Sequence, residues 1–199
     1  MLLGTLGTLG ADPQVQTRAR ELYAEWSRDP ARADRDLMPQ IINILSYTGD
    51  LARYEEFKRN FKNARTPQEE QRYLFSLANF REPELLNKTM EMTLNGEVRT
   101  QNAPFLMHSL LANPVSRYES WDFVRRNWET MVQKYPDSAL PRMCEAVTGL
   151  LDRQQEVNAF FEQHKPRLGQ KIIEQHLERL AVAVAFRDRE GHDLANTLL

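Results

Sequence analysis

Hydrophobic residues recur along this chain at the spacing of an α-helix rather than that of a β-strand. Near the middle, apolar side chains at steps of three and four run from Trp121 through Val124 and Trp128 to Tyr135, which places them on one face of a helix. Alternation with a period of two, which is typical of a half-buried strand, is rare. Because single helices of this length are marginal in water, the stripes predict helices that pack against one another.

Residues with strong capping preferences indicate where these helices begin. Thr66-Pro67-Gln68-Glu69 has the form of a capping box with proline in the first turn, and Asp12-Pro13 combines a cap residue with proline in the same way. Ser116 and Glu119 have the spacing of another capping box. Helix ends are expected at four places: Gly49, Asn95-Gly96, Asn113-Pro114 and Lys165-Pro166.

Together, these patterns predict an all-α fold. About ten helices are expected, at residues 13–28, 36–47, 50–64, 67–79, 83–94, 99–112, 117–135, 139–151, 153–164 and 168–187, with a shorter segment in 188–199. The connections between them are short, so successive helices should form antiparallel hairpins. Serial hairpins build an α-solenoid, and a closed bundle is the alternative. Residues 1–10 look like the end of a helix that begins upstream.

Composition and charge narrow the classes of partner. The 199 residues are 41% hydrophobic and 27% charged, and the formal net charge is -2. This balance is ordinary for a globular protein and provides no overall field for nucleic acid or an anionic membrane. No apolar run reaches the length of about 18 residues that a membrane helix requires. We therefore expect neither a nucleic-acid partner nor a membrane partner.

The residue types that carry catalysis do not form a recognisable site. No two of the four histidines have the i, i+4 spacing at which one helix presents two imidazoles to a metal. His176 is interpreted as a helix-packing residue and His164 as a helix-end residue. The single cysteine, Cys144, excludes an internal disulfide and is expected to be a buried, inert thiol. We therefore assign no catalytic, cofactor-binding or metal-binding residue.

Arginines alternate with aromatic residues in the segment 117–128, a combination that also occurs where proteins stack on nucleic-acid bases. Acidic residues at 119, 122 and 129 share the same predicted helix, and the chain as a whole is slightly acidic. The pattern therefore favours a buried aromatic stripe beneath a surface of mixed charge.

Several short motifs follow one another in an order that resembles a known family. They are Gly49-Asp50 with Tyr54, Thr66-Pro67 with Glu69 and Leu77-Ala78, Val98-Arg99-Thr100-Gln101-Asn102, Asn113 with Arg117, Trp121-Asp122-Phe123, Asn127-Trp128, and Phe160-Phe161 with Leu177-Glu178. This series resembles the helical C-terminal domain of zinc aminopeptidases of the aminopeptidase N and endoplasmic-reticulum aminopeptidase type. The chain departs from that pattern at Ser116, where the family usually has glycine, and at Glu119-Ser120, where it commonly has Leu-Ala.

The resemblance implies a single C-terminal domain over residues 1–199, an α-α superhelix of about five HEAT-like hairpins. In such proteins this domain arches over a separate catalytic domain, closes the substrate chamber and helps to set how long a peptide is admitted. The implied partners are the N-terminal zinc domain of the same polypeptide and peptide substrates. The zinc and the motifs His-Glu-x-x-His and Gly-x-Met-Glu-Asn belong to that earlier domain, and neither motif occurs in these 199 residues.

If the domain contacts peptides, arginines are the natural partners of a peptide carboxylate. The candidates by chemistry are Arg99, Arg117, Arg125 and Arg126. The chain alone is expected to be inactive and to hold no cofactor. Two other interpretations stay open: a free-standing helical-repeat scaffold for a partner protein, and an RNA-binding helical repeat, which the net charge of -2 disfavours.

Overall fold

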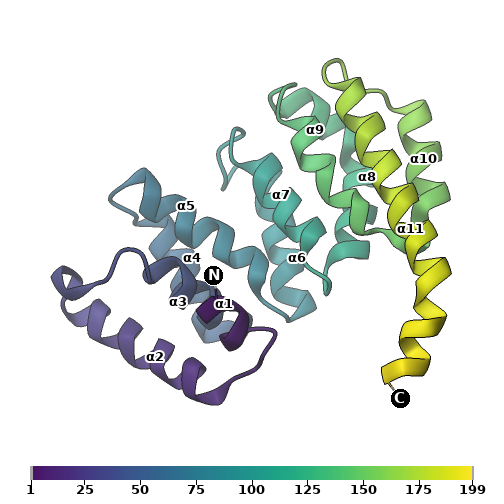
Figure 1. Cartoon of the computed structure of the whole chain (residues 1–199). Coiled ribbons are helices and arrows are strands. Elements are labelled where there is room, and N and C mark those ends of the chain that lie inside the picture. Colours follow the sequence, from purple (N-terminus) through teal and green to yellow (C-terminus); the bar gives the residue numbers. More distant parts are fainter. Residues whose placement is uncertain (1, 199) are drawn as a thin grey trace. The chain divides into compact units, whose positions relative to one another are not determined.

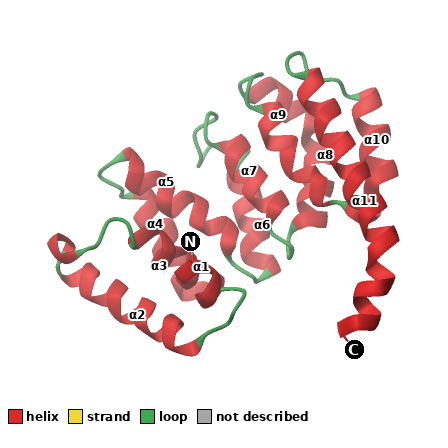
Figure 2. Ribbon diagram, in the orientation of Figure 1, coloured by secondary structure: helices red, strands yellow, loops and turns green. Residues whose placement is uncertain are grey.

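A computed structural model describes the backbone of residues 2–198 and the side chains of residues 2–191 and 197. Over the described residues the chain is built from helices and the loops between them, without a β-strand (Figures 1 and 2). The all-α prediction is confirmed. Its finer form, a HEAT-like superhelix, stays a prediction. Among these residues no helix combines the length and the apolar character needed to cross a bilayer.

The helices follow one another through the whole described chain (Figure 1). The α-helices are α1 (Leu2–Gly7), α2 (Pro13–Arg28), α3 (Met38–Tyr47), α4 (Leu51–Lys62), α5 (Pro67–Ser76), α6 (Pro83–Met92), α7 (Ala103–Ala112), α8 (Arg117–Lys134), α9 (Leu140–Met143), α10 (Gln154–Gln163) and α11 (Gln170–Leu198). Four 3₁₀ segments complete the order: η1 (Pro30–Arg32), η2 (Leu77–Asn79), η3 (Cys144–Gly149) and η4 (Leu151–Arg153).

The chain divides into two compact units, Met1–Thr89 and Met90–Leu199. In the first unit α2 packs on α3, and α4 packs on α5. Its core is aromatic: the rings of Tyr54 and Phe80 meet edge to face at 5.3 Å between centroids, and those of Phe57 and Tyr73 lie 5.3 Å apart. Such pairs add a directional preference to the hydrophobic burial that holds the helices together.

The second unit has its own core, built around the predicted aromatic stripe of α8. Trp121 and Trp128 are buried, and both contact Phe160 of α10 edge to face, at centroid distances of 5.1 Å and 5.4 Å. Helix α11 packs across η3 and α10, and α7 packs on α8, α9 and η3. The interpretation of this stripe as core is thereby confirmed.

Two of the three predicted N-terminal caps form. The carboxylate of Asp12 accepts hydrogen bonds from the backbone N–H groups of Gln14 and Val15 at 2.9 Å and 3.1 Å, and Thr66 Oγ1 accepts one from the N–H of Glu69 at 3.2 Å. The return bond of this second cap differs from the prediction, because the Glu69 carboxylate accepts from the N–H of Arg65 rather than that of the cap residue.

The predicted capping box at Ser116 and Glu119 is wrong. Ser116 makes no side-chain cap bond, and its hydroxyl donates instead to the carbonyl oxygen of Leu110 at 2.7 Å. Ser116 itself is buried, so its hydroxyl must find a partner, and the nearby carbonyl in α7 supplies one.

Several predicted boundaries also need correction. The helix expected over 99–112 begins only at residue 103, and the helix expected over 139–151 is the short α9 followed by the 3₁₀ segments η3 and η4. The separate segment expected in 188–199 is a continuation of α11, which runs unbroken through Gly191. A glycine inside a helix costs about 1 kcal/mol relative to alanine, which a long helix tolerates.

Candidate functional site

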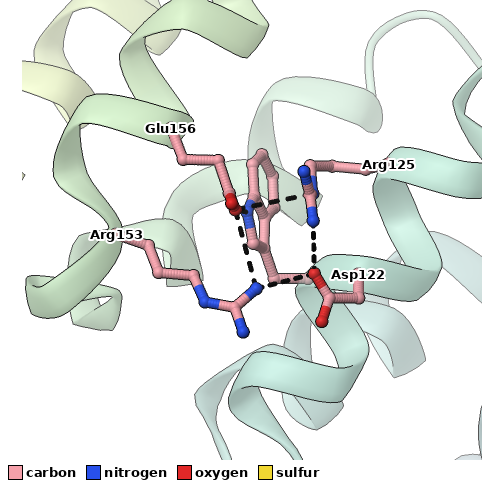
Figure 3. A network of polar contacts seen from close by, with 5 residues as sticks. Asp122, Arg125, Arg153 and Glu156 are labelled. Carbon is pink, nitrogen blue, oxygen red and sulfur yellow. Dashed lines mark hydrogen bonds and ion pairs between the residues drawn. The ribbon is translucent and has the colours of Figure 1, made fainter.

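A network of charged side chains joins α8 to α10 in the second unit. Asp122 accepts hydrogen bonds from Arg125, one turn further along α8, and from Arg153 of η4, the latter at 2.6 Å (Figure 3). Glu156 of α10 accepts a hydrogen bond from the indole Nε1 of Trp121 at 2.6 Å. The network therefore spans residues more than 30 positions apart in the sequence.

Each charge in this network faces an opposite charge. Glu156 Oε1 lies 3.5 Å from Arg125 Nε and 3.6 Å from Arg153 Nη1, so two carboxylates alternate with two guanidinium groups (Figure 3). Burial opposes the ionisation of Asp122, but the hydrogen bonds from Arg125 and Arg153 outweigh it and lower its pKa. The pKa of Arg153 is raised, chiefly by its hydrogen bond to Asp122. Asp122 and Arg153 are therefore charged at neutral pH.

A second polar link ties η4 to α8 and α11. The hydroxyl of Tyr118 donates to Asp152 at 2.9 Å, and the guanidinium of Arg187 on α11 bonds the other oxygen of the same carboxylate. The hydrogen bond from Tyr118, followed by that from Arg187, lowers the pKa of Asp152. These groups are exposed, so the link orients the helices more than it stabilises them.

Arg117, one of the candidate arginines, makes its hydrogen bonds within the domain. Its Nη1 donates to the carbonyl oxygen of Gly149 at 2.9 Å, and its Nη2 donates to that of Ala112 at 3.4 Å. A Cβ added at Gly149 would lie 2.9 Å from the Arg117 Cζ. The guanidinium therefore lies against Gly149, and a Cβ at that position would require the Arg117 side chain to shift.

The other candidate arginines differ in their exposure and in the contacts of their guanidinium groups. Arg125 is half-buried in the network described above, with its Cζ 5.9 Å from the Trp121 ring. Arg126 is exposed and has no ion pair or hydrogen bond of its side chain with another described residue. Arg99 is exposed in the loop before α7.

No metal centre or nucleophilic dyad assembles in the described part of the chain. Within it, no three His, Cys, Asp or Glu side chains converge to hold a metal ion, so those residues do not fit the zinc that the resemblance implies. His176 is buried and its Nε2 lies 3.1 Å from the Pro141 carbonyl oxygen, which confirms its packing role. Cys144 is fully buried, and burial raises the pKa of its thiol, as expected of an unreactive cysteine.

These residues can hold the helices of the second unit at fixed positions relative to one another. Four salt-bridged groups, a buried tryptophan and a glycine-arginine contact connect α8, η3, η4 and α10. Sequence reasoning missed Arg153 and Glu156, although their i, i+3 spacing is that of an ion pair on a helix. Only the packing of α10 against α8 reveals that this pair faces Asp122 and Arg125.

Known proteins resemble this chain over most of its length. The human protein "Endoplasmic reticulum aminopeptidase 2" is 27% identical over 174 residues, which cover 81% of this chain and 18% of that protein. The mouse "Endoplasmic reticulum aminopeptidase 1" is 26% identical over 184 residues, or 89% of this chain and 20% of its own length. The yeast "Aminopeptidase 2, mitochondrial" is 23% identical over 195 residues, or 94% and 20%. The chain thus spans about a fifth of these relatives.

The match to a protein family is broader than any single motif. The sequence model described as "ERAP1-like C-terminal domain" matches residues 1–182, which include the first compact unit, most of the second and every motif named above. The resemblance found from the motifs is therefore confirmed, and with it the position of such a segment at the C-terminal end of aminopeptidases. This chain belongs to the ERAP1-like C-terminal domain family.

Proposed function

We propose that this chain is the non-catalytic C-terminal domain of a zinc aminopeptidase, that it closes the substrate chamber over the catalytic domain, and that it contributes to peptide binding and length selection. The observation that carries the proposal is the family match over residues 1–182 in a chain whose sequence has no His-Glu-x-x-His motif. A segment of an aminopeptidase without the zinc motif would act on substrate together with a neighbouring catalytic domain.

The contacts of the second unit support a mechanical role. A chamber wall selects peptide length only if its helices keep their spacing when a peptide presses on them. The alternating charges of Asp122, Arg125, Arg153 and Glu156 lock α8 to α10, and partly buried networks of this kind fix geometry more than they add stability.

The candidate arginines differ in their fitness for a peptide carboxylate. Arg117 and Arg125 already bond within the domain, so using them for a ligand would break internal contacts. The exposed side chain of Arg126 has no ion pair or hydrogen bond with another described residue, so a ligand could use it without breaking such a contact. We therefore place Arg126 ahead of Arg117 and Arg125 as a contact for peptide substrates.

The reading frame upstream of this chain tests the proposal directly. We expect it to encode Gly-x-Met-Glu-Asn and His-Glu-x-x-His, and the full polypeptide to hold zinc and to release amino acids from peptides. A frame with neither motif would refute the proposal and favour the alternative, a free-standing helical-repeat scaffold.

The purified 199-residue chain provides the complementary measurement. We expect it to contain no zinc above background by mass spectrometry of the metal and to leave an aminoacyl-coumarin substrate intact. Stoichiometric zinc together with hydrolysis of that reporter would show that the chain has its own active site, and the proposal would fail.

A further inference from the structure

A pocket in the second unit lies at the turn between α10 and α11, which pack side by side (Figure 1). Its volume is about 210 Å³, below the roughly 300–1,000 Å³ of pockets that hold drug-sized ligands, so it suits a smaller molecule. Its apolar part is formed by Phe161 of α10 and by Ile173 and Leu177 of α11. The first two side chains are almost fully buried, and Leu177 is half-buried. This surface accommodates a short hydrophobic side chain.

Charged side chains of both signs line the same pocket. Lys165 lies in the turn, and the carboxylates of Glu162 and Glu174 come from α10 and α11. All three side chains are exposed, and none of them makes an ion pair or a hydrogen bond with another described residue. The ammonium and the two carboxylates can therefore each bind an opposite charge of a ligand without breaking such a contact.

The backbone around Lys165 is held in place by its neighbours. The ring of His164 stacks on that of Phe160 at 4.3 Å between centroids, and its Nδ1 lies 2.9 Å from the carbonyl oxygen of the same residue. Pro166, on the other side of the lysine, is buried. Because both flanking residues are fixed, a ligand that binds the ammonium does not have to order the turn first.

The first turn of α11 adds a further preference for a carboxylate. This helix begins at Gln170, which lines the pocket. The leading N–H groups of a helix have no partner within it, and they carry partial positive charge. Glu174 lies four residues further along, which is about 6 Å of helix rise. The pocket therefore presents positive and negative groups within reach of one small zwitterion.

We propose that this pocket binds a free α-amino acid with an apolar side chain. The carboxylate of the ligand contacts Lys165 and the first turn of α11, and its ammonium contacts Glu162 and Glu174. Its side chain lies on the apolar surface around Ile173. The choice of a free amino acid among small zwitterions rests on the proposed function, because aminopeptidases release free amino acids. None of the four candidate arginines takes part in this site.

Titration of the whole ¹⁵N-labelled chain with L-leucine, followed by nuclear magnetic resonance of the backbone amides, tests the site. The shift changes should be concentrated at residues 161–177, with a dissociation constant of about 1 mM, as is typical of a ligand with about nine non-hydrogen atoms. Two analogues each lack one charge: 4-methylpentanoate has no ammonium, and 3-methylbutylamine has no carboxylate. We expect each to bind about fivefold more weakly, because an exposed charge pair contributes modestly. D-leucine should also bind more weakly, since three different contacts distinguish enantiomers.

Variants assign the two charges of the ligand to their partners. Lys165→Met should make leucine and 3-methylbutylamine bind equally. The double variant Glu162→Gln, Glu174→Gln should make leucine and 4-methylpentanoate bind equally. Lys171→Met and Glu178→Gln are the matched controls, because both residues are exposed on α11 and lie outside the pocket; they should leave every affinity unchanged. Circular dichroism establishes that each variant remains folded.

The other results would overturn the proposal. Equal binding of leucine and 3-methylbutylamine by the unchanged chain would show that the pocket binds amines and not amino acids. Equal binding of the two enantiomers, shift changes confined to other parts of the chain, or no shift changes at the highest soluble concentration of leucine would refute the site. A preference for leucine over 3-methylbutylamine that survives Lys165→Met would refute the carboxylate contact. None of these results changes what the upstream reading frame encodes, so failure of this inference is distinguishable from failure of the proposed function.

Discussion

Gly149→Ala is expected to destabilise the second unit only when Arg117 is present. The backbone of Gly149 does not adopt a positive φ, so alanine is compatible with its conformation. The obstacle is the Arg117 guanidinium, since an added Cβ would lie 2.9 Å from Cζ and 3.1 Å from Nε. The side chain can swing away only by giving up its hydrogen bonds to the carbonyl oxygens of Gly149 and Ala112.

The magnitude follows from two opposing terms. Replacing a glycine with alanine at a compatible position stabilises the fold by about 0.4–1 kcal/mol, because the unfolded chain loses freedom. A hydrogen bond from a charged donor contributes about 1.5–3 kcal/mol, and the half-buried position of Arg117 favours the lower end. In the unchanged chain the net loss should be about 1 kcal/mol. In an Arg117→Met background only the gain remains, so the sign of the effect should reverse.

Urea unfolding followed by tryptophan emission measures this reversal. Of the three tryptophans, Trp121 and Trp128 lie in the second unit and Trp26 in the first. A Trp26→Phe background therefore makes the signal report the second unit. The four variants of the Gly149 and Arg117 cycle give the coupling between them, expected at about 1.5 kcal/mol.

Gly191→Ala is the matched control. Gly191 lies inside α11 and is exposed, and an added Cβ would make only an ordinary contact with Arg187. It should stabilise the chain by about 0.5–1 kcal/mol with or without the Arg117 side chain. If Gly149→Ala destabilises by the same amount in both backgrounds, the contact with Arg117 does not account for the glycine and the reasoning is refuted.

Three further predictions concern the second unit. Glu156→Ala should lower the free energy of unfolding in urea by about 1 kcal/mol, because the indole N–H of Trp121 loses its acceptor. Glu156→Gln should recover part of that loss, and equal losses in the two variants would contradict this role. The Asp122 carboxylate has a lowered pKa in the folded state. The unchanged chain should therefore be more stable than Asp122→Asn above the ordinary Asp pKa of about 3.9, and this difference in stability should disappear as the pH falls through the lowered value. A difference that persists in strong acid would refute the ionic origin. The buried Cys144 thiol should react with an aromatic disulfide at least about a thousandfold more slowly in the folded chain than in denaturant, and rapid labelling would show that η3 opens readily.

The sequence predicted those features that depend on neighbours within a few residues. Asp12 caps α2 because its carboxylate reaches N–H groups two and three positions ahead, and the side-chain preference alone determines this. The stripe of Trp121 and Trp128 was interpretable for the same reason, since residues spaced by seven lie on one helix face.

Features that depend on residues far apart in the sequence could not be predicted in this way. Ser116 has the composition of a cap, but its hydroxyl bonds Leu110 because the turn between α7 and α8 buries it. Over the six residues of η3 a period of 3.0 cannot be distinguished from one of 3.6, so the sequence predicts an α-helix there. Here Cys144 and Val147, spaced by three, are both buried, as a 3₁₀ turn requires.

The candidate arginines follow the same division, because residue chemistry alone does not show which guanidinium groups the fold has already bonded. Arg117 and Arg126 are the same residue type in the same helix, yet one guanidinium is bonded to two carbonyl oxygens and the other has no ion pair or hydrogen bond with another described residue. The difference arises from what the neighbouring segments present: a glycine carbonyl from η3 accepts from Arg117, whereas the side chain of Arg126 is exposed. An arginine available to a ligand is therefore identified by the groups it has not already bonded, which only the packed structure specifies.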